Sequence, residues 1–82
     1  MRIDKFLNAV NITKRRTVAQ DMLANGVVSV NGKVVKPSKN VEVGDIVSIA
    51  DLKGEKRYEV LQIPVTKSTP KSQQDQYVKE IA

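Results

Sequence analysis

The 82-residue sequence contains no histidine and no cysteine. Their absence excludes imidazole acid–base catalysis, thiol nucleophiles, disulfides and the metal sites that thiolates and imidazoles form. The nine acidic residues are dispersed, so a metal site made of carboxylates alone is not expected. We therefore predict a chain that is not an enzyme, with no catalytic residues, no metal and no cofactor.

Long apolar runs and exposed aromatic anchors are also missing. No stretch approaches the roughly 18 apolar residues needed to cross a bilayer, and no apolar signal segment follows the charged start of the chain. The sequence has no Trp, one Phe and two Tyr, which disfavours membrane-surface binding and leaves few rings for stacking on single-stranded RNA. We expect a cytoplasmic monomer that binds no membrane.

Positive charge is concentrated in the first half of the chain. Residues 1–39 hold eight Lys or Arg and two acidic residues, a net charge of +6, whereas residues 40–82 hold six and seven, a net charge of −1. A uniformly basic chain need only be soluble, but a one-sided distribution gives a basic face suited to a polyanion. The distribution therefore favours a nucleic-acid partner.

The start of the chain has the pattern of two short helices. One apolar stripe with the spacing i, i+3, i+4 and i+7 predicts a first helix over residues 3–10. Thr13 is expected to cap a second helix that continues to residue 24, with Gly26 ending it in a left-handed conformation. The stripe of the first helix consists of Ile3, Phe6, Leu7 and Val10.

A basic triplet, Lys14-Arg15-Arg16, occupies the predicted start of the second helix. Positive charge is unfavourable there, by about 0.3–1 kcal/mol per exposed residue, because the helix N-terminus is itself positive. A bound anion offsets that cost, and the free backbone N–H groups of a helix start also favour one. The triplet is therefore a candidate phosphate site, although solvated charges are the alternative.

The middle of the chain predicts a small antiparallel sheet. Asn31-Gly32 lies between Val27-Val28-Ser29-Val30 and Lys33-Val34-Val35-Lys36, which is a strong two-residue hairpin pattern. After the turn at Gly44-Asp45, residues 46–49 predict a third strand. A fourth is expected over residues 57–63, after a turn around Lys53-Gly54, with a bulge or an end where the apolar alternation slips after Val60.

The composition turns polar after Pro64, so we place a domain boundary there: residues 1–63 as the folded domain and residues 64–82 as a polar linker. Ser72-Gln73-Gln74-Asp75 resembles a capping sequence, and Tyr77, Val78 and Ile81 could form one side of a last helix. An isolated helix of about ten residues is marginal in water. Truncation after residue 63 is accordingly expected to leave a folded domain.

Two helices followed by a basic hairpin suit folded RNA better than duplex DNA. A helix-turn-helix DNA-binding regulator is the main competitor, because the two helices have suitable lengths. Its second helix, however, offers few side chains for base edges beyond the basic triplet, and phosphate contacts carry no sequence information. A detached subunit of an RNA-modifying enzyme is a further alternative, but it would need an enclosed pocket with a catalytic group.

Four segments together resemble the S4 RNA-binding domain, named after a ribosomal small-subunit protein, and the resemblance covers about residues 1–61. It implies an α+β fold in which two N-terminal helices pack on a small, mostly antiparallel sheet of about four strands, followed by a polar tail or short helix. The helices and hairpin of that family form an L-shaped RNA-docking surface. The segments are Arg2-Ile3-Asp4-Lys5-Phe6-Leu7, Lys14-Arg15-Arg16-Thr17-Val18-Ala19, Gly26-Val27-Val28-Ser29-Val30-Asn31-Gly32 and Val43-Gly44-Asp45.

Members of this length without a catalytic module are similar to factors of bacterial ribosome-associated quality control and, less closely, to heat-shock S4 proteins. The resemblance implies a non-catalytic clamp on the large ribosomal subunit that bridges large-subunit rRNA and peptidyl-tRNA. It would hold the tRNA in the P site while a separate partner protein adds alanine to the stalled chain. A general rRNA-binding protein, or a heat-shock S4 protein that recycles ribosomes, is the alternative.

The resemblance also indicates which residues contact RNA. The family's RNA-binding arginines fall on Arg2 and Arg16, with Lys5, Lys14 and Arg15 beside them. Lys33 and Lys36 on the hairpin are further candidates, although they could serve solubility alone. For Arg2 and Arg16 the alternative is a structural salt bridge, for example to Asp4.

Overall fold

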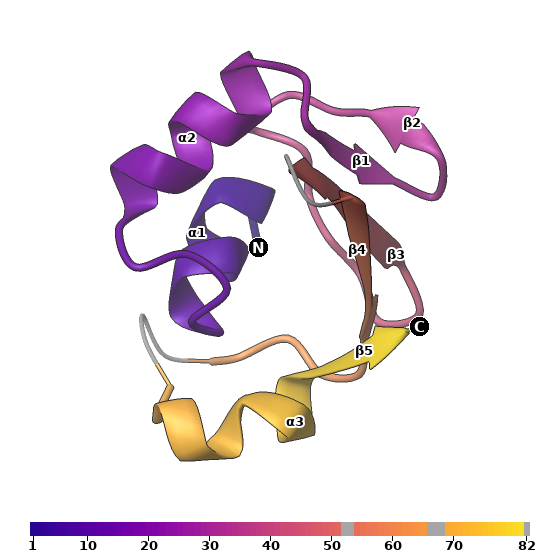
Figure 1. Cartoon of the computed structure of the whole chain (residues 1–82). Helices are drawn as coiled ribbons and strands as arrows, with labels where there is room; N and C mark the ends of the chain where they lie inside the picture. Colours follow the sequence, from indigo (N-terminus) through magenta and orange to yellow (C-terminus); the bar gives the residue numbers. More distant parts are fainter. Residues whose placement is uncertain (52–53, 66–68, 82) are drawn as a thin grey trace.

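The computed structural model describes residues 1–51, 54–65 and 69–81. Two helices lie against one face of a five-stranded antiparallel sheet, and a short helical segment precedes the last strand (Figure 1). This arrangement confirms the predicted α+β fold, with one strand more than expected. The elements are α1 (Ile3–Ala9), α2 (Arg16–Ala24), β1 (Val28–Val30), β2 (Lys33–Val34), β3 (Ile46–Asp51), β4 (Gly54–Val60), the 3₁₀ turn η1 (Lys71–Gln73), α3 (Gln74–Tyr77) and β5 (Val78–Ile81).

Helix α1 forms where the apolar stripe predicts it, and its stripe is completely buried. The helix ends because Asn11 takes a left-handed conformation, with φ of 66°. The N–H groups of Ile12 and Thr13 then both donate to the carbonyl of Leu7, at 3.0 and 3.1 Å. These bonds fold the connection between the helices tightly against the end of α1.

The predicted cap of the second helix is wrong. Helix α2 begins at Arg16 and not directly after Thr13, and Arg15, in an extended conformation, occupies the N-cap position without a side-chain hydrogen bond. Thr13 cannot cap the helix because its backbone is tied to α1 and its side chain is buried. Lys14 therefore lies in the loop, and only Arg16 of the basic triplet is helical. The other end is as predicted, with Gly26 at φ of 72°.

The strands are ordered β2-β1-β3-β4-β5, and every neighbouring pair is antiparallel. Asn31 and Gly32 join β1 to β2 with φ of 52° and 85°, which confirms the predicted two-residue turn. The Asn31 side chain also donates to the Asp45 carboxylate at 3.1 Å and accepts from the Ile46 N–H at 3.0 Å. The turn of the hairpin is thereby fastened to the start of β3.

Strand β4 starts and ends earlier than the predicted residues 57–63. It begins at Gly54 and stops at Val60, so the slip in the apolar pattern marks the end of the strand. Beyond Val60 the backbone bonds elsewhere: the N–H of Leu61 donates to the carbonyl of Tyr77 at 2.8 Å. The turn predicted around Lys53-Gly54 lies partly outside the described residues.

The end of the chain differs most from the sequence prediction. Instead of a helix carrying Tyr77, Val78 and Ile81, the short helix α3 stops at Tyr77 and the strand β5 follows. Strand β5 pairs with β4 from Val78, opposite Val60, to Ile81, opposite Arg57. Residues 69–81 are thus part of the fold and not a linker, because pairing with the edge of the sheet decides their conformation over local preference.

Polar residues just before β5 cap the first helix. The Thr69 hydroxyl and N–H both donate to the carbonyl of Ala9, at 2.8 and 3.0 Å, and the Gln74 side chain donates to the carbonyl of Val10 at 2.8 Å. The Asn11 side chain returns a bond to the carbonyl of Thr69, also at 2.8 Å. Carbonyls at a helix C-terminus need such partners, so the end of the chain completes α1.

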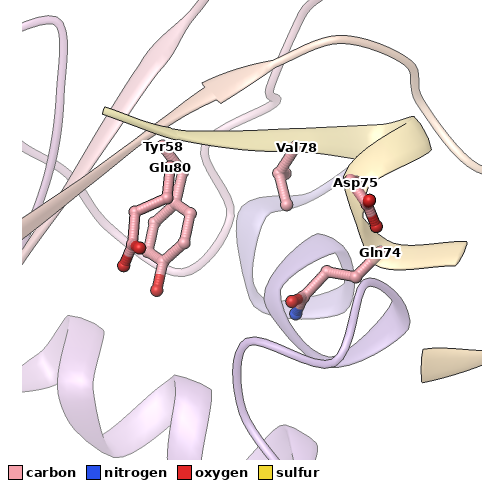
Figure 2. Close-up of a pocket in the computed structure, with 5 residues that line it drawn as sticks. All are labelled: Tyr58, Gln74, Asp75, Val78 and Glu80. Atoms are coloured by element: carbon pink, nitrogen blue, oxygen red, sulfur yellow. The ribbon is translucent and has the colours of Figure 1, made fainter. Parts of the chain in front are cut away.

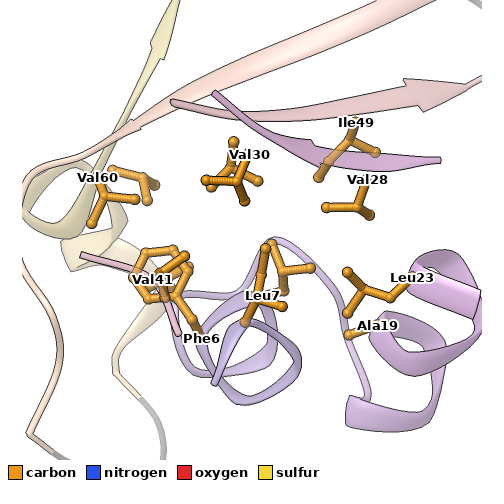
Figure 3. Packing of buried hydrophobic residues seen from close by; sticks show 13 residues of the cluster. Phe6, Leu7, Ala19, Leu23, Val28, Val30, Val41, Ile49 and Val60 are labelled. Atoms are coloured by element: carbon orange, nitrogen blue, oxygen red, sulfur yellow. The ribbon is translucent and has the colours of Figure 1, made fainter. Parts of the chain in front are cut away.

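One hydrophobic core lies between the helices and the sheet (Figure 3). Phe6 and Leu7 of α1 and Leu23 of α2 face the side chains of the strands. Val78 of β5 belongs to the same cluster and is 3% exposed. The remaining buried members are Ile3, Val10, Ala19, Val28, Val30, Val41, Val47, Ile49 and Val60.

Candidate RNA-binding surface

The centre of the candidate surface is a buried carboxylate. Asp4 is completely buried in the first turn of α1. Its Oδ2 accepts hydrogen bonds from Arg2 Nη2 at 3.2 Å, Arg16 Nη2 at 3.3 Å and Gln20 Nε2 at 3.2 Å. Its Oδ1 accepts the N–H of Lys5 at 2.8 Å. One carboxylate thus joins the start of α1 to the first two turns of α2.

These contacts decide the charge of Asp4. Burial alone raises the pKa of a carboxyl group, because it disfavours the ionised form. The hydrogen bonds from Gln20, Lys5 and Arg16, together with the positive charge of Arg16, outweigh burial and lower the pKa of Asp4 below its usual value. Asp4 is therefore an anion at neutral pH, and it holds Arg2 and Arg16 by charge-assisted bonds.

Arg2 and Arg16 both form ion pairs with Asp4, which is the structural alternative to RNA contact. Both arginines are nevertheless accessible to solvent. Their side chains are 45% exposed for Arg2 and 42% for Arg16. Among the residues that the structure describes, each bonds Asp4 through Nη2, and the other N–H donors of the guanidinium group have no partner. Structural pairing and RNA contact are therefore compatible for these two residues.

A loop that follows the hairpin brings further cations beside the start of α1. The N–H of Ile3 donates to the carbonyl of Lys39 at 2.7 Å, and Arg2 forms a β-bridge with Asn40. The N–H of Asp4 also approaches the carbonyl of Pro37, at 3.4 Å. Lys36 and Lys39, both exposed, flank this contact. The backbone thus places this part of the chain next to Arg2.

Lys39 is a candidate that the sequence analysis did not single out. It is one of the eight cations of residues 1–39, but no helix or strand pattern distinguishes it. Only the pairing of its backbone with Ile3 shows that it lies beside the arginines.

The remaining predicted site residues are exposed but less closely tied together. Lys5 continues α1 directly after Asp4, and Lys14 and Arg15 lie in the loop that leads to Arg16. Lys33 follows the turn of the hairpin and pairs with Val30, a core residue. Because cross-strand partners project from the same face, Lys33 lies on the face of the sheet that the helices cover. The hairpin itself extends away from the start of α2 (Figure 1).

The other end of the molecule carries a pocket of different character. It has a volume of about 210 Å³ and is lined by Tyr58, Gln74, Asp75, Val78 and Glu80 (Figure 2). Two of these five side chains are carboxylates, so the pocket repels phosphates. Its lining residues come from β4, α3 and β5, and α3 lies away from the hairpin and the end of α2 (Figure 1).

Two further observations concern metals and membranes. Within residues 1–51, 54–65 and 69–81, no three His, Cys, Asp or Glu side chains are grouped so that they could hold a metal ion. Over the same part of the chain, no helix has the length and apolar character required to span a bilayer.

Two helices packed on an antiparallel sheet, with cations collected at the starts of both helices, define a small S4-like domain. Residues 1–47 match the S4 domain family. A protein from Helicobacter pylori strain J99, called RQC P-site tRNA stabilizing factor, is 47% identical over 78 residues, which are 95% of this chain and 93% of that relative. The chain belongs to the S4 domain family.

Solved structures agree with this assignment. The fold is similar to heat shock protein 15 of Vibrio cholerae, described as trimeric, with a TM-score of 0.89 and 32% identity over 100% of this chain and 82% of the other. It is also similar to the solution structure of a hypothetical protein, HP1423, with a TM-score of 0.87 and 44% identity over 100% and 98% of the two chains. The heat-shock protein is the more distant of the two in sequence.

Proposed function

We propose that the chain is a non-enzymatic RNA-binding protein of ribosome-associated quality control. It binds large ribosomal subunits that are obstructed by peptidyl-tRNA, contacts large-subunit rRNA and the tRNA, and stabilises the tRNA in the P site. A separate partner protein on the same particle extends the stalled chain with alanine. The relative that is 47% identical, and whose name describes P-site tRNA stabilisation, supports this proposal.

The observation that carries the proposal is the pair of half-exposed arginines on Asp4. RNA phosphates are recognised by guanidinium groups through charge-assisted hydrogen bonds. A buried anion that fixes two such groups reduces the side-chain entropy lost when RNA binds. Lys5, Lys33 and Lys36 then supply longer-range attraction, which steers the RNA and makes the affinity depend on salt.

Stabilising the tRNA requires only that the protein bind the tRNA-occupied subunit better than the empty one. A tenfold preference corresponds to about 1.4 kcal/mol. One or two additional charge-assisted bonds to the tRNA supply that difference. Lys14, Arg15 and Arg16, at the loop and start of α2, are the residues we assign to these contacts.

The test compares two particles. Purified protein is titrated against large subunits that are empty and against subunits that carry peptidyl-tRNA in the P site. We expect tighter binding to the loaded particle, by about tenfold or more, and shorter alanine tails on stalled chains in cells lacking the gene. Equal binding to both particles, with tailing undiminished, would leave a general rRNA-binding protein.

Variants connect the test to the surface. Arg16→Ala and Arg2→Ala should weaken binding to the loaded subunit while the domain stays folded. Arg57→Ala is the matched control, because Arg57 is an exposed arginine of β4 whose described ion pair is with an exposed carboxylate, Glu55, at 3.7 Å. Unchanged binding by the Arg16 and Arg2 variants would assign both arginines a structural role alone.

The structural similarity to heat shock protein 15 supports a second candidate, a heat-shock type of S4 protein that recycles ribosomal subunits. The comparison of alanine tails in cells with and without the gene separates the two. A recycling protein also binds the loaded subunit, but alanine tailing in cells does not depend on it. Preferential binding to duplex DNA would instead identify the helix-turn-helix alternative.

A further inference from the structure

We infer that Arg2 and Arg16 together hold a single RNA phosphate group, and that Asp4 is the positioning residue that sets their geometry. The inference rests on the proposed function and specifies how the RNA is held. It assigns one ligand, a phosphodiester, to two arginines that are 14 positions apart in the sequence.

The two guanidinium groups meet at one oxygen atom of Asp4. Arg2 Nη2 and Arg16 Nη2 both bond the same oxygen, Asp4 Oδ2, at 3.2 and 3.3 Å. The two nitrogens are therefore at most 6.5 Å apart (3.2 plus 3.3 Å). Two guanidinium groups this close, each anchored through one nitrogen and half-exposed, can place their remaining donors on the oxygens of one phosphate.

The net charge of the three side chains also fits a phosphate. Arg2 and Arg16 contribute two positive charges and the buried Asp4 removes one, so the cluster carries a net charge of +1. A phosphodiester carries a single negative charge and would neutralise the cluster. The charge of these three side chains therefore matches that of one phosphate.

Asp4 acts in this arrangement through the arginines and does not touch the RNA, because it is completely buried. Its Oδ1 is held by the N–H of Lys5 and its Oδ2 also by Gln20, so the carboxylate itself is fixed. An exposed arginine on its own samples many rotamers and loses that freedom on binding. Anchoring by Asp4 removes part of that cost in advance.

A double-mutant cycle tests the shared phosphate. Affinity for tRNA-loaded large subunits is measured for wild type, Arg2→Ala, Arg16→Ala and the double variant, each over a range of salt concentrations. If one phosphate is shared, each single variant loses most of the affinity that the contact contributes. The affinity of the double variant is then only slightly lower than that of the weaker single variant. Two independent phosphates predict that the fold-losses multiply.

The salt dependence gives a second, independent readout. Each neutralised phosphate contributes about 0.7–0.9 to the slope of log affinity against log salt. If Arg2 and Arg16 share one phosphate, the slope is lower than that of wild type by about 0.7–0.9 in both single variants and in the double variant. Two phosphates lower it by about twice as much in the double variant, and that result would overturn the inference.

The positioning role of Asp4 and simple electrostatics predict opposite changes in RNA affinity for the Asp4→Asn variant. Asp4→Asn removes a buried negative charge from beneath the surface that faces RNA, so charge alone predicts tighter binding. Loss of positioning predicts weaker binding, by about tenfold if the anchoring is worth one charge-assisted bond. Tighter binding by a folded Asp4→Asn variant would refute the role of Asp4.

Lysine variants keep the test valid if Asp4→Asn does not fold. Arg2→Lys and Arg16→Lys retain the charge but cannot bond the carboxylate and a phosphate through one planar fork. Weaker binding by either lysine variant supports the clamp, whereas full affinity in both contradicts it. Arg57→Lys is the matched control. If the wild-type protein does not prefer the loaded subunit, the proposed function is refuted. If the wild type has that preference but the fold-losses of affinity of Arg2→Ala and Arg16→Ala multiply in the double variant, only the shared phosphate is refuted.

Discussion

Residues 1–39 and residues 40–82 contribute to this small domain in different ways. The first region carries a net charge of +6, and two of its exposed arginines, Arg2 and Arg16, bond one buried carboxylate. The second carries a net charge of −1 and supplies three of the five strands as well as the groups that cap α1. The comparison shows that one region presents the proposed RNA surface and that the other completes the core behind it.

Truncation after residue 63 is expected to have the largest effect on stability, because it removes part of the region that completes the core. Truncation after residue 63 deletes β5, takes Val78 out of the core and leaves the carbonyls of Ala9 and Val10 without their caps. Buried Val contributes about 1.5–3 kcal/mol and each hydrogen bond about 1 kcal/mol. We expect a loss of about 4–6 kcal/mol, a large share of the total stability of a small domain.

Urea denaturation followed by circular dichroism measures this loss. The control is Lys79→Ala, which changes an exposed residue of the same strand and should alter stability by no more than about 0.5 kcal/mol. A truncated chain that unfolds cooperatively at the wild-type urea concentration would restore the boundary that the sequence suggested between residues 63 and 64.

The next largest effect on stability is expected in residues 1–39, at Asp4. Asp4→Asn removes the anion that both arginines bond, and we expect a loss of about 1.5–3 kcal/mol at neutral pH, the range for hydrogen bonds to charged groups. The lowered pKa of Asp4 also gives a pH dependence. Its contribution is fully present above the unfolded-state pKa of 3.8 and is lost as pH falls through the still lower pKa of the folded state.

Thermal melting of wild type and Asp4→Asn between neutral and acidic pH checks both expectations. The difference in melting temperature should be constant near neutral pH and should shrink below pH 3.8. A difference that grows in acid would mean that Asp4 is not a stabilising anion in the folded protein.

Thr13 provides a smaller effect of opposite sign. Its hydroxyl is buried and has no hydrogen-bond partner among the described residues. Thr13→Val keeps the shape and the β-branch while removing the unpaired hydroxyl, so we expect a gain of about 1 kcal/mol in unfolding free energy. Thr17→Val, at an exposed position of α2, is the control. A destabilised Thr13→Val protein would show that the hydroxyl has a partner after all.

The smallest change in stability is expected on the hairpin. Lys33→Ala and Lys36→Ala affect exposed side chains and should change the unfolding free energy by no more than about 0.5 kcal/mol. If these lysines neutralise phosphates, each substitution should still lower the salt-dependence slope of RNA binding by about 0.7–0.9. An unchanged slope would leave them a role in solubility only.

The two regions also differ in how far their structure could be predicted from the sequence. The apolar stripe of α1, Gly26 and the Asn31-Gly32 turn are local patterns, and each appears where the sequence places it. Strand β5 has no such pattern, because its four residues become a strand only through pairing with β4. Pairing partners of this kind are not encoded in a short window of sequence.

The candidate site shows the same limit. The family resemblance indicates Arg2 and Arg16 as RNA-binding residues, and the sequence leaves an ion pair with Asp4 open as the alternative. One buried carboxylate bonds both arginines at once and has Gln20 as a third donor. This arrangement depends on how α1 packs against α2, which the sequence does not reveal. The proximity of Lys39 to Arg2 likewise depends on backbone pairing between distant segments.

The capping of α1 by Thr69 and Gln74 has a consequence for how the chain is made. Synthesis proceeds from the N-terminus, and domains generally fold as units once their residues have emerged. Here the first helix obtains its C-terminal partners from residues near the end of the chain, and the sheet acquires its edge strand last of all. The growing polypeptide therefore cannot complete this domain until residues 69–81 have emerged from the ribosome, because they supply the last caps of α1 and the edge strand β5.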